Sequence, residues 1–374
     1  MDRFTLIHTA DVHLGLSGES FAGRGSDHRR LLREAFERVV DCCLEQPTDL
    51  LLVAGDLFDS PQPGRRTVES VLGHFLRLGR VDHPVEVVLL PGSHDRLREE
   101  GIYAEWLAEG LPENVHILAD PRGAPVALAG GEVLVHGGPG CLRLAAEDGV
   151  SFNVGAIHAP LQLGNLMSSA EPVLTPRDIA DTRMDYLALG HWHRFGDYST
   201  GGVTALYSGA PEITALDQAE RGQAVRVELS QGGLARYERL PLGRLRREQL
   251  EVNLADFDTQ YQLAEDLRRR AEAELILDVT LAGLADPSFR YDAGELEDLL
   301  SSDFFRVRIT DEGELAAAEI TESRYPEELV VGRFVRLMED RLQRAAASGA
   351  AEQTQLERQA LQLGLALLER KEAL

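Results

Sequence analysis

The stretch LLLVAGDLFD at residues 50–59 decides the fold of this 374-residue chain. The five apolar residues from Leu50 to Ala54 have the length and composition of a strand that is buried on both faces. This run ends at Gly55-Asp56, and Asp59 follows shortly after it. A buried strand with polar side chains at its carboxyl end is typical of an α/β protein that binds a ligand at that edge of the sheet.

Four other segments repeat this arrangement of an apolar run followed by polar side chains. In chain order they are Phe4–His8 with Asp11 and His13, Val85–Leu90 with Ser93, His94 and Asp95, Phe152–Ile157 with His158, and Tyr186–Leu189 with His191 and His193. Apolar residues at helical spacing in residues 28–45 and 68–78 separate the first three strands. Helices between buried strands predict parallel pairing in an α/β sheet or a mixed sandwich.

The side chains at these strand ends are those of a metal site. Carboxylate and imidazole ligands together suit Mn, Fe or Zn better than Ca or Mg alone. Two such ions, about 3.5–4 Å apart, clamp a phosphoryl group and lower the pKa of a bound water. A carboxylate has to bridge ions that lie so close, and Asp56 in the central motif is the predicted bridge.

The order Asp-x-His, Gly-Asp-x-x-Asp, Gly-x-His-Asp, His and Gly-His-x-His resembles the signature of calcineurin-like metallophosphoesterases, from residue 5 to about residue 212. The resemblance implies a β-sandwich flanked by helices. It also implies a ligand set for each of two divalent ions, most simply Mn, with Fe, Zn or Mg as alternatives. One set is Asp11, His13, Asp56 and His193, and the other is Asp56, Ser93, His158 and His191.

The same resemblance assigns roles to three further residues. His94 matches the histidine that orients or protonates the leaving group, and Asp95 matches its carboxylate partner. Asp59 falls where related nucleases carry Asp or His, and we expect it to orient a ligand or the substrate.

Ser93 departs from the family pattern, which has Asn before the catalytic histidine. The Asn amide oxygen is a metal ligand in the family, and a Ser hydroxyl stands on a shorter side chain. We therefore predict that the second ion binds more weakly, or that a water bridges the gap.

The opening IHTADVHLG at residues 7–15 and the AGDLFD motif also resemble the SbcD-type DNA nuclease family. The break at Pro241-Leu242-Gly243 predicts three segments: a nuclease domain at 1–240, a small α/β capping domain at 241–325 and a helical tail at 326–374. In that family the cap contacts DNA, and the C-terminal helices dock onto an SbcC-type coiled-coil ABC ATPase. The resemblance thus implies DNA and such an ATPase as partners, with a homodimer contact as an alternative role for the tail.

The composition limits the other classes of function. The formal net charge is −24, which argues against strong DNA binding by the chain alone, because phosphate contacts need a basic footprint. The three cysteines form no disulfide framework, no apolar run approaches the ~20 residues of a membrane span, and the N-terminus does not resemble a signal peptide. We therefore expect a cytoplasmic protein that does not cross a membrane.

The sequence thus predicts a metal-dependent DNA phosphodiesterase of an SbcCD-like repair complex. Two alternatives stay open from the residues. One is a phosphodiesterase for small substrates, with the C-terminal part as a lid or dimer element. The other is a non-catalytic subunit in which Ser93 leaves a mainly structural metal site.

Overall fold

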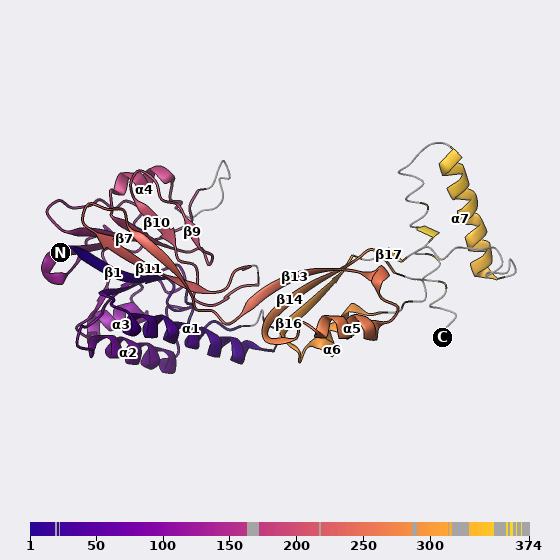
Figure 1. Cartoon of the computed structure of the whole chain (residues 1–374), viewed down its shortest axis with the longest axis horizontal. Coiled ribbons are helices and arrows are strands. Elements are labelled where there is room, and N and C mark those ends of the chain that lie inside the picture. Colours follow the sequence, from indigo (N-terminus) through magenta and orange to yellow (C-terminus); the bar gives the residue numbers. More distant parts are fainter. Residues whose placement is uncertain are drawn as a thin grey trace. The chain divides into compact units, whose positions relative to one another are not determined.

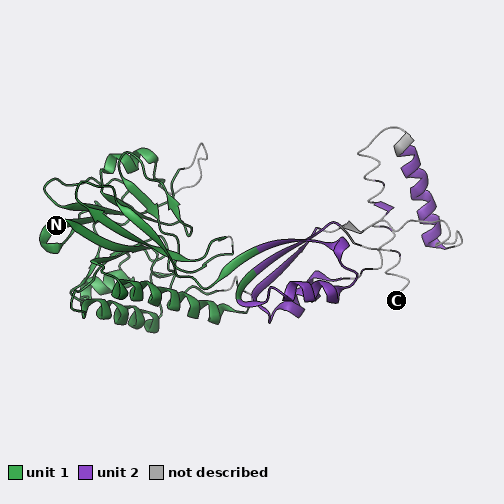
Figure 2. Ribbon diagram, in the orientation of Figure 1, with its two compact units in different colours: residues 1–248, 274–276 green, residues 249–273, 277–374 purple. Residues whose placement is uncertain are grey.

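The computed structural model describes residues 1–18, 21, 23–162, 172–216, 218–285, 289, 291–312, 314–315 and 329–347, and residues 357, 360, 361, 364 and 368 beyond them. The chain divides into two compact units (Figure 2). Unit 1 contains residues 1–248 and 274–276, and unit 2 contains residues 249–273 and 277–374. The roles predicted for the three segments stay predictions.

The first sheet of unit 1 contains six strands in the order β12-β11-β1-β2-β3-β4. Strands β1 to β4 pair in parallel, whereas β11 and β12 are antiparallel additions beside β1. The bounds of these strands are Arg3–Thr9 (β1), Leu50–Ala54 (β2), Glu86–Leu90 (β3), Val115–Ile117 (β4), Gln223–Ser230 (β11) and Arg236–Pro241 (β12). The strands predicted around residues 50–54 and 85–90 are therefore present, and they are neighbours.

The second sheet also contains six strands, in the order β5-β6-β7-β8-β10-β9. Strands β6, β7, β8 and β10 are parallel to one another. The bounds are Val126–Leu128 (β5), Val133–Gly137 (β6), Phe152–His158 (β7), Tyr186–Gly190 (β8), Gly196–Asp197 (β9) and Thr204–Tyr207 (β10).

The two sheets stack face to face and helices cover both outer faces (Figure 1). Side chains alternate along each strand. Leu50 and Leu52 of β2 therefore join the core between the sheets, while Leu51 and Val53 face the helical layer. Helices α1 (Gly25–Glu45), α2 (Arg65–Gly79) and α3 (Ile102–Glu109) pack on the first sheet, and α4 (Pro176–Thr182) packs on the second. The predicted sandwich flanked by helices is confirmed.

A three-stranded sheet in the order β13-β14-β16 and two short helices belong mainly to unit 2, although residues 246–248 of β13 and 274–276 of β14 are counted in unit 1. The elements are β13 (Arg246–Asn253), η3 (Leu254–Asp256), α5 (Gln260–Arg268), β14 (Glu272–Ala282), α6 (Ala293–Leu300) and β16 (Phe304–Asp311), with a short pair β15 (Leu284–Ala285) and β17 (Glu314–Leu315). The sequence pattern of residues 257–273 predicts a helix over that range, but α5 is shorter at both ends. Thr259 caps its start by accepting from the N–H of Gln262, and residues from Glu272 onward pair in the sheet instead. Tertiary pairing overrides a local helical pattern in such cases.

Helix α7 (Val330–Ala347) lies within the predicted helical tail. Three of its buried side chains, Val331, Val335 and Met338, pack with Leu361. The apolar spacing of the tail predicts one buried stripe that includes Val330 and Leu337, but these two residues are 71% and 55% exposed. The spacing also predicts a second stripe, whose members Leu356, Leu363 and Leu367 lie outside the described residues. Among the helices that the structure describes, none combines the length and the apolar character needed to cross a membrane.

Glu212 anchors the chain segment that leads out of the sandwich. Its fully buried carboxylate accepts hydrogen bonds from the main-chain N–H groups of Ile213, Arg244 and Leu245 at 3.0, 2.7 and 3.1 Å. The guanidinium of Arg38 lies 3.8 Å away. Burial raises the pKa of Glu212 to about 7, although these donors and Arg38 oppose the shift.

The raised pKa of Glu212 predicts a pH-dependent contribution to stability. The folded pKa exceeds the ordinary value of 4.5, so the folded state holds this proton more tightly than the unfolded chain does. The contribution is fully present below pH 4.5 and is lost as the pH rises through 7. Relative to Glu212→Gln, the wild type should lose up to about 3 kcal/mol between these limits.

Urea unfolding of both proteins at pH 4.5 and 8, followed by tryptophan fluorescence, checks this expectation. Both tryptophans of the chain, Trp106 and Trp192, belong to unit 1, so the signal reports the unit that contains Glu212. A difference between the two proteins that is the same at both pH values would contradict the prediction.

Candidate metal centre

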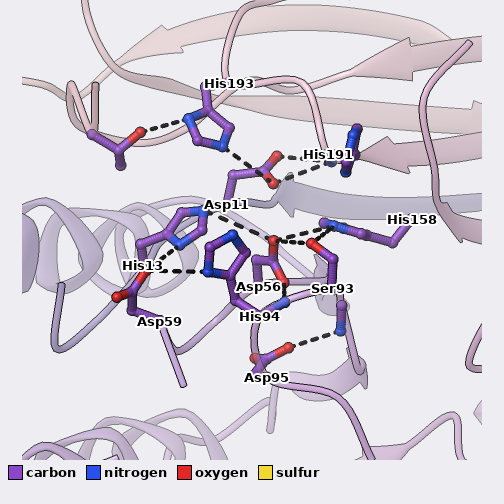
Figure 3. A network of polar contacts seen from close by, with 12 residues as sticks. Asp11, His13, Asp56, Asp59, Ser93, His94, Asp95, His158, His191 and His193 are labelled. Atoms are coloured by element: carbon purple, nitrogen blue, oxygen red, sulfur yellow. Dashed lines mark hydrogen bonds and ion pairs between the residues drawn. The ribbon is translucent and has the colours of Figure 1, made fainter. Parts of the chain in front are cut away.

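The predicted metal-binding side chains gather at one edge of the sandwich (Figure 3). Asp11 and His13 follow β1, Asp56 follows β2, and Ser93 follows β3. From the second sheet, His158 is the last residue of β7, and His191 and His193 follow β8. All five strands are parallel to a neighbour in their own sheet, and their carboxyl ends meet here, where open α/β sheets bind ligands.

The backbone is strained at four of these positions. The φ angles are positive, at 54°, 49°, 52° and 104° for Asp11, His13, Asp56 and His191. Residues other than glycine rarely adopt this region. Hydrogen bonds fix the backbone at two of these positions. The N–H of Asp11 donates to Gly55 O at 3.1 Å, and the N–H of His13 donates to Asp56 O at 3.0 Å. Strain of this kind persists where the surrounding structure enforces it, and it gathers at functional sites.

Glycines make room for the close approach of the strand ends. A Cβ atom on Gly55 would collide with the ring of His158, and one on Gly92 would collide with the carboxylate of Asp56. Gly55 also has a φ angle of +96°, which glycine adopts without strain. Gly55 therefore leaves space for the His158 ring, and Gly92 leaves space for the Asp56 carboxylate.

The donor atoms form overlapping clusters around buried carboxylates, and two of these clusters share Asp11. One cluster is Asp11, His13 and His193, and another is Asp11, Asp56 and His158; in each, one atom per residue lies within 4.8 Å of the others. Nε2 of His193 lies 3.9 Å from Asp11 Oδ1, and Nε2 of His158 lies 3.2 Å from Asp56 Oδ2. Both carboxylates are almost fully buried, and buried charges require a partner of opposite sign.

The electrostatics of the cluster fit a bound cation. Burial by itself would lower the pKa of His158, but the hydrogen bond to Asp56 and the charges of Asp11 and Asp56 raise it to about 9. A proton on His158 thus supplies positive charge that a metal ion would otherwise bring. Nε2 of His13 is buried and has no hydrogen-bond partner among the described residues, and it lies 3.8 Å from Asp56 Oδ2. The residues present therefore fit a divalent cation.

His94 and Asp59 lie on the open side of the cluster. The His94 side chain is 51% exposed, and its main-chain N–H donates to Asp56 Oδ1 at 2.7 Å. Asp59 Oδ1 lies 3.0 Å from His13 Nδ1 and 3.4 Å from His94 Nδ1. Asp59 therefore contacts both a candidate ligand and the candidate proton donor, and its orienting role stays a prediction.

Asp95 has different surroundings from those predicted. Its buried carboxylate accepts hydrogen bonds from the N–H groups of Phe58 and Gly92 and from the hydroxyl of Tyr103, at 3.0, 2.7 and 2.8 Å. Burial and the nearby charge of Asp56 raise its pKa above the ordinary value. The structure places Asp59, rather than Asp95, within ion-pair distance of the His94 imidazole, and Asp95 holds the turns that carry Phe58 and Gly92.

Comparison with known proteins agrees with this geometry. The family model described as "Calcineurin-like phosphoesterase" matches residues 4–195, which is more than half of the chain and spans every candidate ligand. The chain belongs to this family. The phosphoesterase therefore binds divalent metal, because its family and its clustered carboxylates and imidazoles both point to such a site.

Individual relatives are more distant. The "DNA double-strand break repair protein Mre11" of Thermoplasma acidophilum is 27% identical over 245 residues, which cover 60% of this chain and 62% of that protein. The protein of the same name from Methanopyrus kandleri is 26% identical over 301 residues, covering 73% and 64%. The SbcD component of the nuclease SbcCD from Rhodobacter capsulatus is 25% identical over 292 residues, covering 63% and 69%. The phosphoesterase thus spans less than two thirds of the first two relatives.

Ser93 of the phosphoesterase makes two contacts inside the cluster. Its hydroxyl donates to Asp56 Oδ2 at 3.0 Å and lies 3.4 Å from His158 Nε2. The hydroxyl therefore lies between the two side chains that the second predicted ion would share. An Asn at position 93 has no hydroxyl to donate to Asp56. Its longer side chain would instead present an amide oxygen to the ion.

Ser93→Asn is expected to tighten the weaker of two Mn²⁺ binding steps by about tenfold, because an amide oxygen replaces a hydroxyl or a bridging water at a hard cation. Isothermal titration of the metal-free protein with MnCl₂ measures both steps. Identical titrations of the wild type and the variant would contradict the role given to residue 93.

His191 and two residues outside the motifs complete the site. The main-chain N–H of His191 donates to both oxygens of Asp11 at 3.1 Å, and its ring meets that of His158 edge-on at 5.4 Å. Thr214 and Gln218 were missed by sequence reasoning, although Thr214 bonds His193 directly. A threonine and a glutamine in a loop have no motif spacing, so no sequence signal marked them.

Proposed function

We propose that this phosphoesterase is a metal-dependent DNA nuclease, most simply with two Mn²⁺ ions, and with Fe, Zn or Mg as alternatives. The observation that carries the proposal is the pair of carboxylate–imidazole clusters that share Asp11 beside the exposed imidazole of His94. Two ions bound there would neutralise the phosphodiester and lower the pKa of an attacking water. Relatives whose names give nuclease or double-strand-break repair roles support DNA as the substrate.

The chain supplies the ligands and the geometry around the reacting group. Asp11, His13, Asp56 and His193 would hold one ion, and Asp56, Ser93, His158 and His191 the other. Asp59 accepts from His13 Nδ1 and lies 3.4 Å from His94 Nδ1, so it orients both rings. With Nδ1 directed to Asp59, the Nε2–H of His94 is the group that can give a proton to the departing oxygen.

The acidic surface of the chain supports a subunit that gains DNA affinity from a partner. The formal net charge is −24, which opposes DNA binding over distances of a Debye length, about 8–10 Å at physiological ionic strength. We propose an SbcC-type coiled-coil ATPase as this partner. Helix α7 supports this role, because Val330 and Leu337 expose apolar side chains on it, as does Leu329 just before it.

Cleavage assays test the proposal. Linear duplex DNA, single-stranded DNA and a small chromogenic phosphodiester are incubated with the full chain and MnCl₂, with and without an SbcC-type ATPase from the same organism. Mn²⁺-dependent DNA cleavage that rises with the ATPase supports the nuclease. Cleavage of the small ester alone would favour a small-substrate phosphodiesterase, and metal binding without any cleavage would favour the non-catalytic alternative.

A further inference from the structure

The hydrogen-bond partner of Nδ1 in His193 differs in kind from the Nδ1 partners of His13 and His158. Nδ1 of His13 lies 3.0 Å from the carboxylate of Asp59, and Nδ1 of His158 lies 2.9 Å from the main-chain carbonyl of Ala54. Both partners can only accept a hydrogen bond, so each ring carries its proton on Nδ1. Nδ1 of His193 instead lies 2.7 Å from the hydroxyl of Thr214, a group that can donate or accept.

Gln218 determines whether the Thr214 hydroxyl donates to His193 or accepts from it. Its Oε1 atom accepts hydrogen bonds from the main-chain N–H groups of Thr214 and Ala215 at 2.6 and 3.0 Å. Its Nε2 atom donates to the carbonyl of His193 at 2.8 Å. Main-chain N–H groups only donate and carbonyls only accept, so the orientation of this amide is determined by its neighbours. The Thr214 hydroxyl lies 2.9 Å from Oε1 and must donate its single hydrogen there.

The protonation of His193 follows from this inventory of hydrogens. A hydroxyl that has given its hydrogen to Gln218 can only accept from the imidazole, so Nδ1 of His193 carries the proton. The lone pair is then on Nε2, which lies 3.9 Å from Asp11 Oδ1 and faces the cluster. Thr214 and Gln218 are 6% and 8% exposed, so water competes little for these bonds.

We propose that Thr214 and Gln218 are positioning residues that lock His193 as its Nδ1–H tautomer and present Nε2 to a divalent cation. This inference rests on the proposed metal-dependent function for the role of the ion, but the tautomer itself exists in the metal-free protein. Such supporting partners of a ligand histidine change metal affinity or activity by about 10–100-fold when they are removed.

Three variants separate the steps of this argument. Thr214→Val keeps the shape of the side chain and removes the hydroxyl. Gln218→Met removes the acceptor, which leaves the hydroxyl able to donate to His193 Nδ1. Thr214→Ser retains the hydroxyl and should behave like the wild type. Thr182→Val is the matched control, because its buried hydroxyl donates to Ile179 O in α4 and has no contact with the metal centre.

Nitrogen NMR of ¹⁵N-histidine-labelled, metal-free protein reads the tautomer, with His193→Gln used to assign the signal. Wild type, Thr214→Ser and Thr182→Val should show His193 as the Nδ1–H form. Thr214→Val and Gln218→Met should show a mixture or the Nε2–H form, and their Mn²⁺ dissociation constants from calorimetry should rise about 10–100-fold. The Thr214→Ser constant should stay within about threefold of the wild type.

Two results would overturn the inference. One is an Nε2–H tautomer of His193 in the wild type, and the other is unchanged Mn²⁺ affinity in both Thr214→Val and Gln218→Met. These readouts need no substrate. Absence of DNA cleavage by a wild type that shows the predicted tautomer and Mn²⁺ effects would therefore refute the proposed nuclease and leave the positioning role standing.

Discussion

Asp56→Asn is expected to lower Mn²⁺-dependent phosphodiester hydrolysis by about 1,000-fold or more, because the transition-state charge would lose its metal support. Asp56 Oδ2 lies 3.2 Å from His158 Nε2 and 3.8 Å from His13 Nε2, which belong to different predicted ligand sets. Burial by itself would raise the pKa of Asp56, but the hydrogen bond from His158 and the charges of His158 and His13 lower it below its ordinary value. The residue is therefore ionised, and Asn would remove the charge that the two proposed ions would share.

The asparagine variant separates charge from shape. Its side-chain oxygen can still accept from the N–H of His94, which donates to Asp56 Oδ1 at 2.7 Å in the wild type. Mn²⁺ calorimetry should show the loss of at least one binding step. Asp185→Asn is the matched control, because Asp185 also accepts a main-chain N–H, that of Asn153 at 2.7 Å, but precedes β8 at the opposite end of the strand. Full Mn²⁺ binding together with more than about a tenth of the wild-type rate would refute the bridging role.

His94→Ala is expected to reduce kcat on DNA by about 100–10,000-fold, the range for a lost general acid. The effect should depend on the leaving group. A small diester with a nitrophenolate leaving group needs little protonation, so its rate should fall far less than the rate on DNA. Mn²⁺ affinity should stay at the wild-type value, because the imidazole is 51% exposed and is not in either predicted ligand set.

A change in Mn²⁺ affinity in His94→Ala would point to a different role for His94. The donor atoms of His13, Asp56 and His94 also lie within 4.8 Å of one another, so weaker Mn²⁺ binding in His94→Ala would identify His94 as a ligand rather than a proton donor. Equal rate losses on DNA and on the nitrophenyl ester would argue against proton transfer. His83→Ala, at an exposed histidine, controls for the loss of an imidazole from the surface.

Much of unit 1 could be predicted from local sequence. The apolar run at residues 50–54 is β2, and the amphipathic segment at residues 28–45 lies within α1. These elements follow from side-chain periodicity and burial, which are local properties. Strand β13 and the end of α5 could not be predicted, because strand pairing with other segments of the chain decides them.

The convergence of the candidate ligands was also predictable, for a topological reason. Parallel strands of one sheet bring their carboxyl ends to one edge, so Asp11 and Asp56, which follow neighbouring strands, had to approach one another once the strands were recognised. His193 follows a strand of the second sheet, so its approach to Asp11 depends on how the two sheets stack. The partner of His94 was not predictable in this way. Asp59 and Asp95 both follow strands, and only the packed turns direct Asp59 to the imidazole and Asp95 to Phe58, Gly92 and Tyr103.

The sequence by itself therefore determined the sandwich, the family and the candidate ligands of the metal centre, because each depends on short motifs placed after strands. The tertiary structure alone decided how those residues are held. Thr214 and Gln218 act on His193 across a turn of irregular structure, and Glu212 acts on a segment about 30 residues away along the chain. Hydrogen-bond direction and burial arise only when separate segments pack together, so no local pattern could reveal these contacts.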